Sequence, residues 1–443
     1  MSNSISYKNI LRIAFPIIIS GVAQNVVNVT DTMFLGRLSN IALGAGGNAG
    51  IFYFVLVLTG MGFTTGTQII IGRRNGEKNY TQIGRVFNHC LYFIIPLSLF
   101  LFFFIKYLSP FLLATITLSP NILDASNQYL NYRAFGIFFA FINFSFMAFY
   151  VGTTKTKILI HTTVLMMLVN VFLDYALIFG NFGFPKMEIE GAALASVISE
   201  ATAMVYFILY TFYKIDIDQY KMFHFDGFDS AIFKRILRIG SPVMLQNFLS
   251  ISSWFIFFMI IEKLGEKELA ISHIIRSIYM VLMIPLFGFS SATNTLVSNL
   301  IGEGNSDKVL TLIKRVIILS LTSTSCVLLL NIFLPQEIIG FYTKDLNLIN
   351  DTIPTLNVIS FTMFTFAIAF ILFNGVSGTG NTRTSLLIEA VTITIYLAST
   401  YYIAIVLQSA LPVVWCSEFI YFGLLGSMSF AYLKWGNWRK VDI

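Results

Sequence analysis

Long apolar runs are the feature that most limits what this chain can fold into. Each run has about 20 residues or more, the length that a helix needs to cross the hydrocarbon core of a bilayer. Only 11% of the 443 residues are charged, whereas soluble domains have about 25% charged residues. Inside a bilayer the backbone polar groups must be satisfied within the segment, which favours helices. We therefore expect an all-α polytopic membrane protein.

Turn residues and clustered charges divide the chain into twelve such runs. The predicted transmembrane helices are 10–35, 43–71, 87–108, 132–151, 158–179, 191–212, 236–261, 269–300, 313–334, 354–376, 386–407 and 411–433. Most of the 28 Lys and Arg residues fall in the two termini and in every second connection, so the positive-inside rule predicts cytoplasmic termini. Residues 1–10 lack the pattern of a removable signal peptide, and we expect the first helix to stay in the membrane.

The two halves of the chain resemble each other at a constant offset of 226 residues. Pro16 corresponds to Pro242, Gly62-Phe63 to Gly288-Phe289, and Gly152-Thr153 to Gly378-Thr379. Because each half holds six spans, the halves form a parallel repeat, a secondary-transporter architecture that binds substrate between the repeats. We expect an N-lobe over 1–212, a cytoplasmic linker over 213–235 and a C-lobe over 236–443, around a central cavity.

A polar face interrupts the first apolar run. Gln24, Asn28 and Asp31 are spaced i, i+4 and i+7 and therefore share one side of the helix. A carboxylate at the centre of an inserted helix costs about 2.5–3.5 kcal/mol on the gentlest scale, so such a group is by default an ion or proton site. Gln24 and Asn28 either line the route to Asp31 or satisfy each other and the backbone.

The fifth run supplies two more polar residues, Asn170 and Asp174, on one helix face. If this helix meets the first, Asp31 joins them in a cluster of two carboxylates and one amide. Two adjacent carboxylates cannot both ionise at low cost, so the pair takes up a proton, or its oxygens coordinate Na⁺. The alternative is that both acids reach water at their helix ends.

The second half does not repeat this cluster. The positions equivalent to Asp31, Asn170 and Asp174 are Phe257, Tyr396 and Thr400. Ion chemistry is therefore expected in the first half only.

Three further acids and two prolines lie inside the runs. Glu200 and Glu418 occupy equivalent places near mid-membrane and are either functional or neutral, hydrogen-bonded acids. Glu389 lies near a helix end and is interpreted as structural. Pro16 is expected to kink the first helix and move Asp31, and Pro242 is interpreted as structural.

Motifs for enzymatic chemistry are missing from the sequence. No His, Cys and Asp set has metal-ligand spacing, and neither G-x-S-x-G nor G-x-x-x-x-G-K-[ST] occurs. We expect no enzyme, no cofactor and no metal other than Na⁺ at Asp31, Asn170 and Asp174.

Several segments resemble the multidrug and toxic compound extrusion (MATE) family. They are 30–38 (TDTMFLGRL), 152–156 (GTTKT), 170–174 (NVFLD), 191–196 (GAALAS) and 378–383 (GTGNTR). The resemblance favours the DinF-like branch, because the acids of the NorM-like branch fall at Ser250 and Phe366 here. It implies that Asp31, Asn170 and Asp174 form the cation site, and Ser196 falls at a family position that carries a hydroxyl.

The resemblance implies an antiporter of the bacterial inner membrane that alternates between outward and inward openings. It would export organic, amphipathic or cationic compounds in exchange for H⁺ or Na⁺. Expected partners are the small-molecule substrate and membrane lipid, with no nucleic acid, and the chain is expected to be a monomer. The alternatives are a flippase for lipid-linked oligosaccharides or lipids from the same superfamily, and a non-transporting receptor or membrane enzyme.

Overall fold

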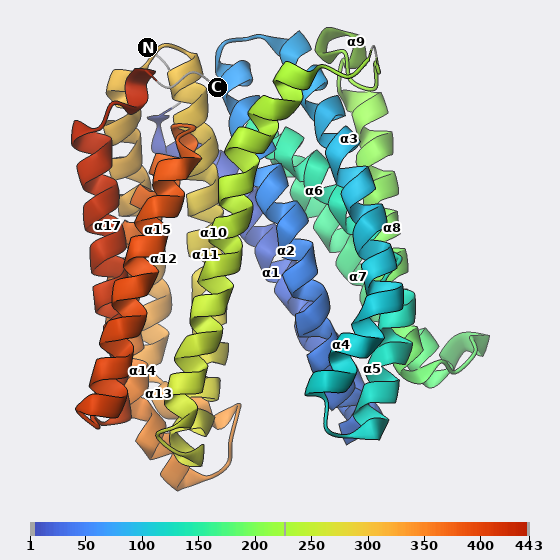
Figure 1. Ribbon diagram of the computed structural model, residues 1–443, viewed down its shortest axis with the longest axis vertical. Helices are drawn as coiled ribbons and strands as arrows, with labels where there is room; N and C mark the ends of the chain where they lie inside the picture. Colours follow the sequence, from blue (N-terminus) through green and yellow to red (C-terminus); the bar gives the residue numbers. More distant parts are fainter. Residues whose placement is uncertain (1–4, 226, 441–443) are drawn as a thin grey trace. The chain divides into compact units, whose positions relative to one another are not determined.

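The computed structural model describes residues 5–225 and 227–440, and each regular element in these ranges is a helix (Figure 1). Among these residues, eleven helices are long and apolar enough to cross a membrane. A bent pair, α5 and α6, raises the number to 12 if it counts as one span. The predicted all-α, polytopic fold class is therefore confirmed.

The described residues of the first half, 5–225, form nine α-helices. They are α1 (Tyr7–Leu38), α2 (Asn40–Gly76), α3 (Tyr80–Phe103), α4 (Ser109–Ile116), α5 (Pro120–Arg133), α6 (Gly136–Gly152), α7 (Lys157–Phe179), α8 (Glu188–Lys214) and the short α9 (Ile217–Tyr220). Local sequence sets several boundaries. The Ser39 hydroxyl accepts a hydrogen bond from the Ala42 amide at 3.0 Å and caps α2, and Gly180 ends α7 with a left-handed backbone, φ 75°.

Residues 227–440, the described part of the second half, form eight α-helices. They are α10 (Ser230–Glu262), α11 (Glu266–Gly302), α12 (Val309–Phe333), α13 (Pro335–Gly340), α14 (Leu346–Gly378), α15 (Thr382–Tyr401), α16 (Leu411–Trp415) and α17 (Ser417–Trp435). The Asp345 carboxylate caps α14 by accepting hydrogen bonds from the amides of Asn347 and Leu348. Most ends of the long helices in both halves lie within a few residues of the ends of the predicted runs.

Helix α5 is the main element that hydropathy did not predict. The fourth run was placed at 132–151, whereas the helical segment begins at Pro120 and bends by 51° between α5 and α6. Its sequence, PNILDASNQYLNYR, is too polar to read as a span. The helix begins with Ser119 as its cap, and Pro120 occupies the first turn, where a missing amide hydrogen costs nothing.

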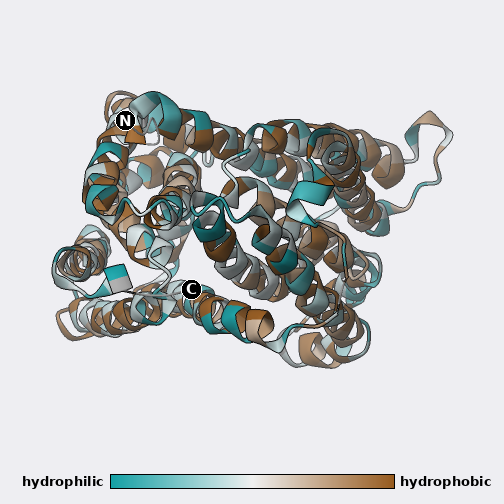
Figure 2. Ribbon diagram, turned by 90° about the horizontal axis from the view of Figure 1, so that it is seen from above, coloured by the Kyte–Doolittle hydropathy of each residue, from teal (hydrophilic) through white to brown (hydrophobic). Residues whose placement is uncertain are grey.

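Large apolar side chains are exposed on the long helices. Examples are Ile51, Phe100, Leu168, Phe255 and Leu387. Hydrophobic residues recur along the helices when the ribbon is coloured by hydropathy (Figure 2). A water-soluble protein rarely exposes so much contiguous apolar surface, so these faces are suited to lipid.

Contacts divide the chain into two compact units. One comprises Ile19–Met244, and the other comprises Met1–Ile18 together with Leu245–Ile443. Helices α1 and α10 each change unit two residues after a proline, Pro16 and Pro242, which are equivalent in the repeat. The predicted lobes, 1–212 and 236–443, follow the sequence repeat instead, and their boundaries stay a prediction.

Glycines allow the beginnings of α1 and α10 to pack closely within these units. A Cβ atom on Gly66 would lie 2.4 Å from the Cα atom of Gly240, and one on Gly288 would lie 2.3 Å from the Ile18 side chain. The backbones of α2 and α10 therefore touch at a point where no larger residue fits. In the other unit, Ile10, Ile13 and Ala14 of α1 belong to the core formed with the second half.

We predict that Gly66→Ala destabilises the protein by about 1–3 kcal/mol, because backbone atoms of Gly240 cannot move aside as a side chain would. Gly50→Ala is the matched control on the same helix, since its new methyl group would have nothing within 4 Å. Thermal unfolding in detergent should show a lower melting temperature for Gly66→Ala alone. Equal melting temperatures for the two variants would contradict the close contact.

Candidate cation-coupling site

Asp31, Asn170 and Asp174 come together in the unit Ile19–Met244, as the sequence predicted. Asp31 lies on α1, and the other two lie on α7 with 0% of their side chains exposed. Asp31 interacts electrostatically with Asp174 and lies within reach of Asn170. The structure thus places two carboxyl groups and an amide side by side.

Five polar atoms of this cluster are buried and have no hydrogen-bond partner. They are Asp31 Oδ1, both side-chain polar atoms of Asn170, and both carboxyl oxygens of Asp174. Buried polar atoms in folded proteins are almost always paired, because an unpaired one costs about 1–3 kcal/mol. Each of these carboxyl oxygens can accept a proton or coordinate a cation, so the arrangement is suited to binding one.

Aromatic and backbone contacts hold the helices in place around the cluster. The Phe34 ring packs on Tyr175 and Phe179 at 6.4 and 5.9 Å between centroids, which joins α1 to α7 beside the acids. The Met187 amide donates to the Leu177 carbonyl at 2.8 Å. A Cβ on Gly191 would lie 2.8 Å from the Leu177 backbone, so only glycine lets α8 begin this close to α7.

The other predicted site residues do not join the cluster through hydrogen bonds. Ser196 is buried on α8, 7% exposed, and forms no hydrogen bond to the acids among the described residues. Gln24 and Asn28 are exposed on α1. Pro16 is buried within α1, which continues as a helix from Tyr7 to Leu38.

Glu200 has a partner that the sequence did not reveal. The Arg133 guanidinium forms a two-bond ion pair with its carboxylate, at 2.7 Å from Nη1 to Oε2 and 2.5 Å from Nη2 to Oε1. The same guanidinium lies 4.0 Å from the centre of the Tyr53 ring, and the Asn143 amide donates to the Glu200 carbonyl at 2.9 Å. The Arg133 guanidinium therefore balances the charge of the Glu200 carboxylate. This arrangement differs from the neutral, hydrogen-bonded acid that was one of the two alternatives from the sequence.

The bend between α5 and α6 makes room for this ion pair. Arg133 is the last residue of α5, and a Cβ on Gly136 would lie 2.0 Å from Arg133 Nη1. The two partners are separated by 67 positions in the sequence. Counting the charged residues inside the apolar runs would have singled out both Arg133 and Glu200. No local sequence pattern shows that the two form a pair.

The ion pair and the acid cluster influence each other, because both Arg133 and Glu200 interact electrostatically with Asp31. The neighbourhood holds three carboxyl groups and one guanidinium. Full ionisation would leave two negative charges uncompensated in a membrane-spanning region, which is costly. One or two protons, or a bound cation, would remove that cost.

A metal centre with several His, Cys or acidic ligands is not present in residues 5–225 and 227–440. Any Na⁺ at the cluster would therefore rely on Asp31, Asp174 and the Asn170 amide oxygen. In the second half, the equivalent positions are filled by a stack of Phe257 on Tyr396, 5.8 Å between centroids.

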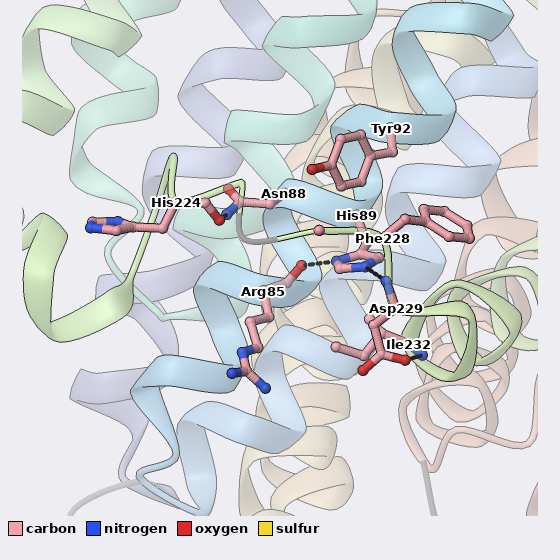
Figure 3. Close-up of a pocket in the computed structure, with 9 residues that line it drawn as sticks. Arg85, Asn88, His89, Tyr92, His224, Phe228, Asp229 and Ile232 are labelled. Atoms are coloured by element: carbon pink, nitrogen blue, oxygen red, sulfur yellow. Dashed lines mark hydrogen bonds between the residues drawn. The ribbon is translucent and has the colours of Figure 1, made fainter.

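A pocket of about 240 Å³ lies elsewhere in the unit Ile19–Met244, between α3 and the segment before α10 (Figure 3). The Asn88 side chain anchors this segment: it donates to the His224 carbonyl at 2.8 Å and accepts from the Phe223 amide at 3.0 Å. The His89 ring accepts from the Asp229 amide at 2.8 Å. Two backbone amides, of Ala231 and Ile232, lower the pKa of the exposed Asp229 carboxyl, as at a helix N-terminus. None of the predicted site residues lines this pocket.

The fold and the cluster define a polytopic helical membrane protein made of two related halves, with buried acids in the first. The MatE family model matches the chain twice, over residues 16–176 and 242–403. The chain therefore belongs to the MatE family, and the predicted MATE membership is confirmed. The two matches start at Pro16 and Pro242, which also confirms the internal repeat.

Known proteins resemble the chain along most of its length. A probable multidrug resistance protein NorM from Thermotoga maritima is 27% identical over 396 residues, covering 87% of this chain and 83% of that protein. One from Synechocystis is 24% identical, covering 77% and 74%. A crystal structure of a MATE protein in complex with MaL6 superposes with a TM-score of 0.88 over 97% of this chain and 95% of that one, at 19% identity.

We predict that Arg133→Met destabilises the protein by about 3–5 kcal/mol, because it leaves the Glu200 carboxylate buried without a countercharge. The double variant Arg133→Met/Glu200→Met should recover much of that loss. Thermal unfolding in detergent measures both. Lys186→Ala serves as the control, because the Lys186–Glu188 pair is 57% exposed and such pairs contribute about 1 kcal/mol or less. A double variant no more stable than Arg133→Met would contradict the ion-pair account.

Proposed function

We propose that this chain is a secondary active antiporter of the DinF-like branch, which exports organic, amphipathic or cationic compounds in exchange for H⁺ or Na⁺. The observation that carries the proposal is the fully buried Asp174 carboxyl beside the half-buried Asp31 carboxyl, where three carboxyl oxygens, Asp31 Oδ1 and both of Asp174, lack a hydrogen-bond donor. The names of its relatives, which describe multidrug resistance proteins, supply the class of cargo.

Binding of the ion can be coupled to export through the first helix. Asp31 lies on α1, the same helix that passes from one compact unit into the other two residues after Pro16. A cation that binds Asp31 and Asp174 more tightly in one arrangement of α1 than in another shifts the population toward that arrangement. If the cargo also binds one arrangement of α1 more tightly than the other, the cargo and the ion change each other's affinity. This mutual effect is sufficient for exchange of one for the other.

The charges near Asp31, in the unit Ile19–Met244, favour an amphipathic or cationic cargo over a lipid diphosphate. A diphosphate needs several free basic groups, whereas the Arg133 guanidinium is already engaged with Glu200. Negative charge dominates around Asp31, which is complementary to a cationic compound. We further propose that the chain works as a monomer in the bacterial inner membrane with both termini in the cytoplasm.

We predict that Asp31→Asn and Asp174→Asn each abolish gradient-driven export, because an amide can neither bind a proton nor balance Na⁺. The measurement is dye efflux from proteoliposomes with an imposed H⁺ gradient and, separately, an imposed Na⁺ gradient. Asp124→Asn is the matched control, since Asp124 is exposed on α5 and accepts a hydrogen bond from Gln128 alone.

The two gradients identify the coupling ion, and the control should export as the unchanged protein does. Full export by both Asp31→Asn and Asp174→Asn would reject the coupling site. If the protein moves a lipid-linked oligosaccharide and not the dye, the proposed class of cargo is rejected. The description of the fold does not depend on this result.

A further inference from the structure

Two more buried carboxyl groups lie in the second half of the chain. Glu389 on α15 is 2% exposed and Glu418 on α17 is 3% exposed. Its place near a helix end would let Glu389 reach water, but the structure buries its side chain. In the described part of the chain, the ion pairs involve neither acid. Carboxylates without a countercharge are too costly to leave ionised in such a place, so each needs a proton or strong hydrogen bonds.

Comparison of the repeats shows why Glu418 differs from Glu200. The two acids are equivalent, and so are Tyr53 and Tyr279, which accompany them. In the first half, Arg133 compensates the acid, but the equivalent position in the second half is Ile359. The Glu418 carboxyl instead accepts a hydrogen bond from the Tyr396 hydroxyl at 2.7 Å and interacts with the neighbouring Tyr279 hydroxyl. Tyrosine hydroxyls have replaced a full positive charge.

The hydrogen bonds of Glu389 are those of a neutral acid. The Tyr421 hydroxyl donates to its Oε1 atom at 2.7 Å, and the Ser250 hydroxyl lies 2.6 Å from the same atom. Ser250 has one hydrogen, which it directs either to Oε1 or to the Gln246 carbonyl at 3.0 Å. The other oxygen, Oε2, is buried and has no partner. An ionised carboxylate shares its charge equally between its oxygens, and donors are expected on both. Hydroxyls gathered on Oε1, with none on Oε2, are the pattern expected of a neutral acid whose carbonyl oxygen is Oε1 and whose proton is on Oε2.

Other unpartnered oxygens lie on the helix faces that hold Glu389. Gln246 Oε1 comes one turn before Ser250 on α10, and Thr392 Oγ1 comes one turn after Glu389 on α15. Both can accept a hydrogen bond from a protonated carboxyl. A proton on Glu389 would supply the donor that Gln246 Oε1 lacks, and the Thr392 hydroxyl can both donate and accept.

The space around the acids is filled with aromatic rings. Tyr279, Tyr396 and Phe257 are each at most 2% exposed, and the rings of Tyr396 and Tyr421 meet at 5.3 Å between centroids. Each of these two tyrosines holds one of the acids, so they join Glu418 to Glu389. Such close packing leaves room for a proton and excludes a hydrated ion or an organic compound.

We propose that Glu389 is the proton-carrying group of a second site in the second half, and that Glu418 is its neighbouring carboxyl, linked to it by Tyr396 and Tyr421. The proton leaves Glu389 for water, and the resulting carboxylate accepts hydrogen bonds from Ser250 and Tyr421. The ionisable groups that face the two acids are Tyr279 from α11, Tyr396 from α15 and Tyr421 from α17. Ion chemistry then belongs to both halves.

The test is infrared difference spectroscopy of the purified full chain between alkaline and acid pH. Asp31→Asn/Asp174→Asn serves as the background, so the acids of the first half do not contribute. We expect a carbonyl stretching band of a protonated carboxyl, and Glu389→Gln should remove a distinct part of it. Glu262→Gln, on an exposed acid at the end of α10, should leave the band unchanged.

A second variant tests the position of the proton even if Glu389→Gln fails to fold. Tyr421→Phe removes the hydroxyl that donates to Oε1, the carbonyl oxygen of the protonated acid. The band should therefore persist and move to higher frequency, since hydrogen bonding weakens a carbonyl bond. An unchanged band in both Glu389→Gln and Tyr421→Phe would overturn the proposal. This outcome would leave the proposed export function untouched, because no transport is measured.

Discussion

The cost of burying a carboxyl group in a membrane protein is the constraint on which the rest of this structure depends. The chain meets it in three ways. Glu200 is neutralised by Arg133, Glu418 is held by two tyrosines, and Asp31 and Asp174 face each other with oxygens that lack partners. The Asp31–Asp174 arrangement is incomplete without an added ion, and Glu389, whose Oε2 atom also lacks a partner, is complete only when protonated. We expect the exchange for cargo at Asp31 and Asp174, where two acids adjoin, and the compensated acids shape its surroundings.

The repeat explains how one scaffold supports different chemistry in its halves. Each half begins with a long helix that changes unit two residues after its proline. Glycines at Gly66 and Gly240 permit the close backbone contact that this exchange of helix ends requires. Function then comes from substitutions at equivalent positions: Asp31 against Phe257, Asn170 against Tyr396, and Arg133 against Ile359. The scaffold is shared, whereas the charges are not.

Sequence reasoning succeeded where one physical signal dominated. Hydropathy gave the spans, and helical spacing placed Asn170 and Asp174 on one face. Helix α5 was missed because its residues are polar, and hydropathy does not detect such a helix. The Arg133–Glu200 pair was missed because its members are distant in sequence and meet only where α5 and α6 bend. The buried Glu389 meets Ser250 of α10 and Tyr421 of α17, residues distant in sequence that no local pattern pairs with it.

The central claim is that cargo and cation exchange at Asp31 and Asp174. Calorimetric titration of the purified protein with a transported dye tests it most directly. Repeating the titration in buffers of different ionisation enthalpy counts the H⁺ released per dye bound, and the dependence of dye affinity on Na⁺ concentration gives the Na⁺ released. The account predicts release of at least one H⁺ or Na⁺ by the unchanged protein and its loss in Asp31→Asn/Asp174→Asn. The same release from both proteins would contradict it.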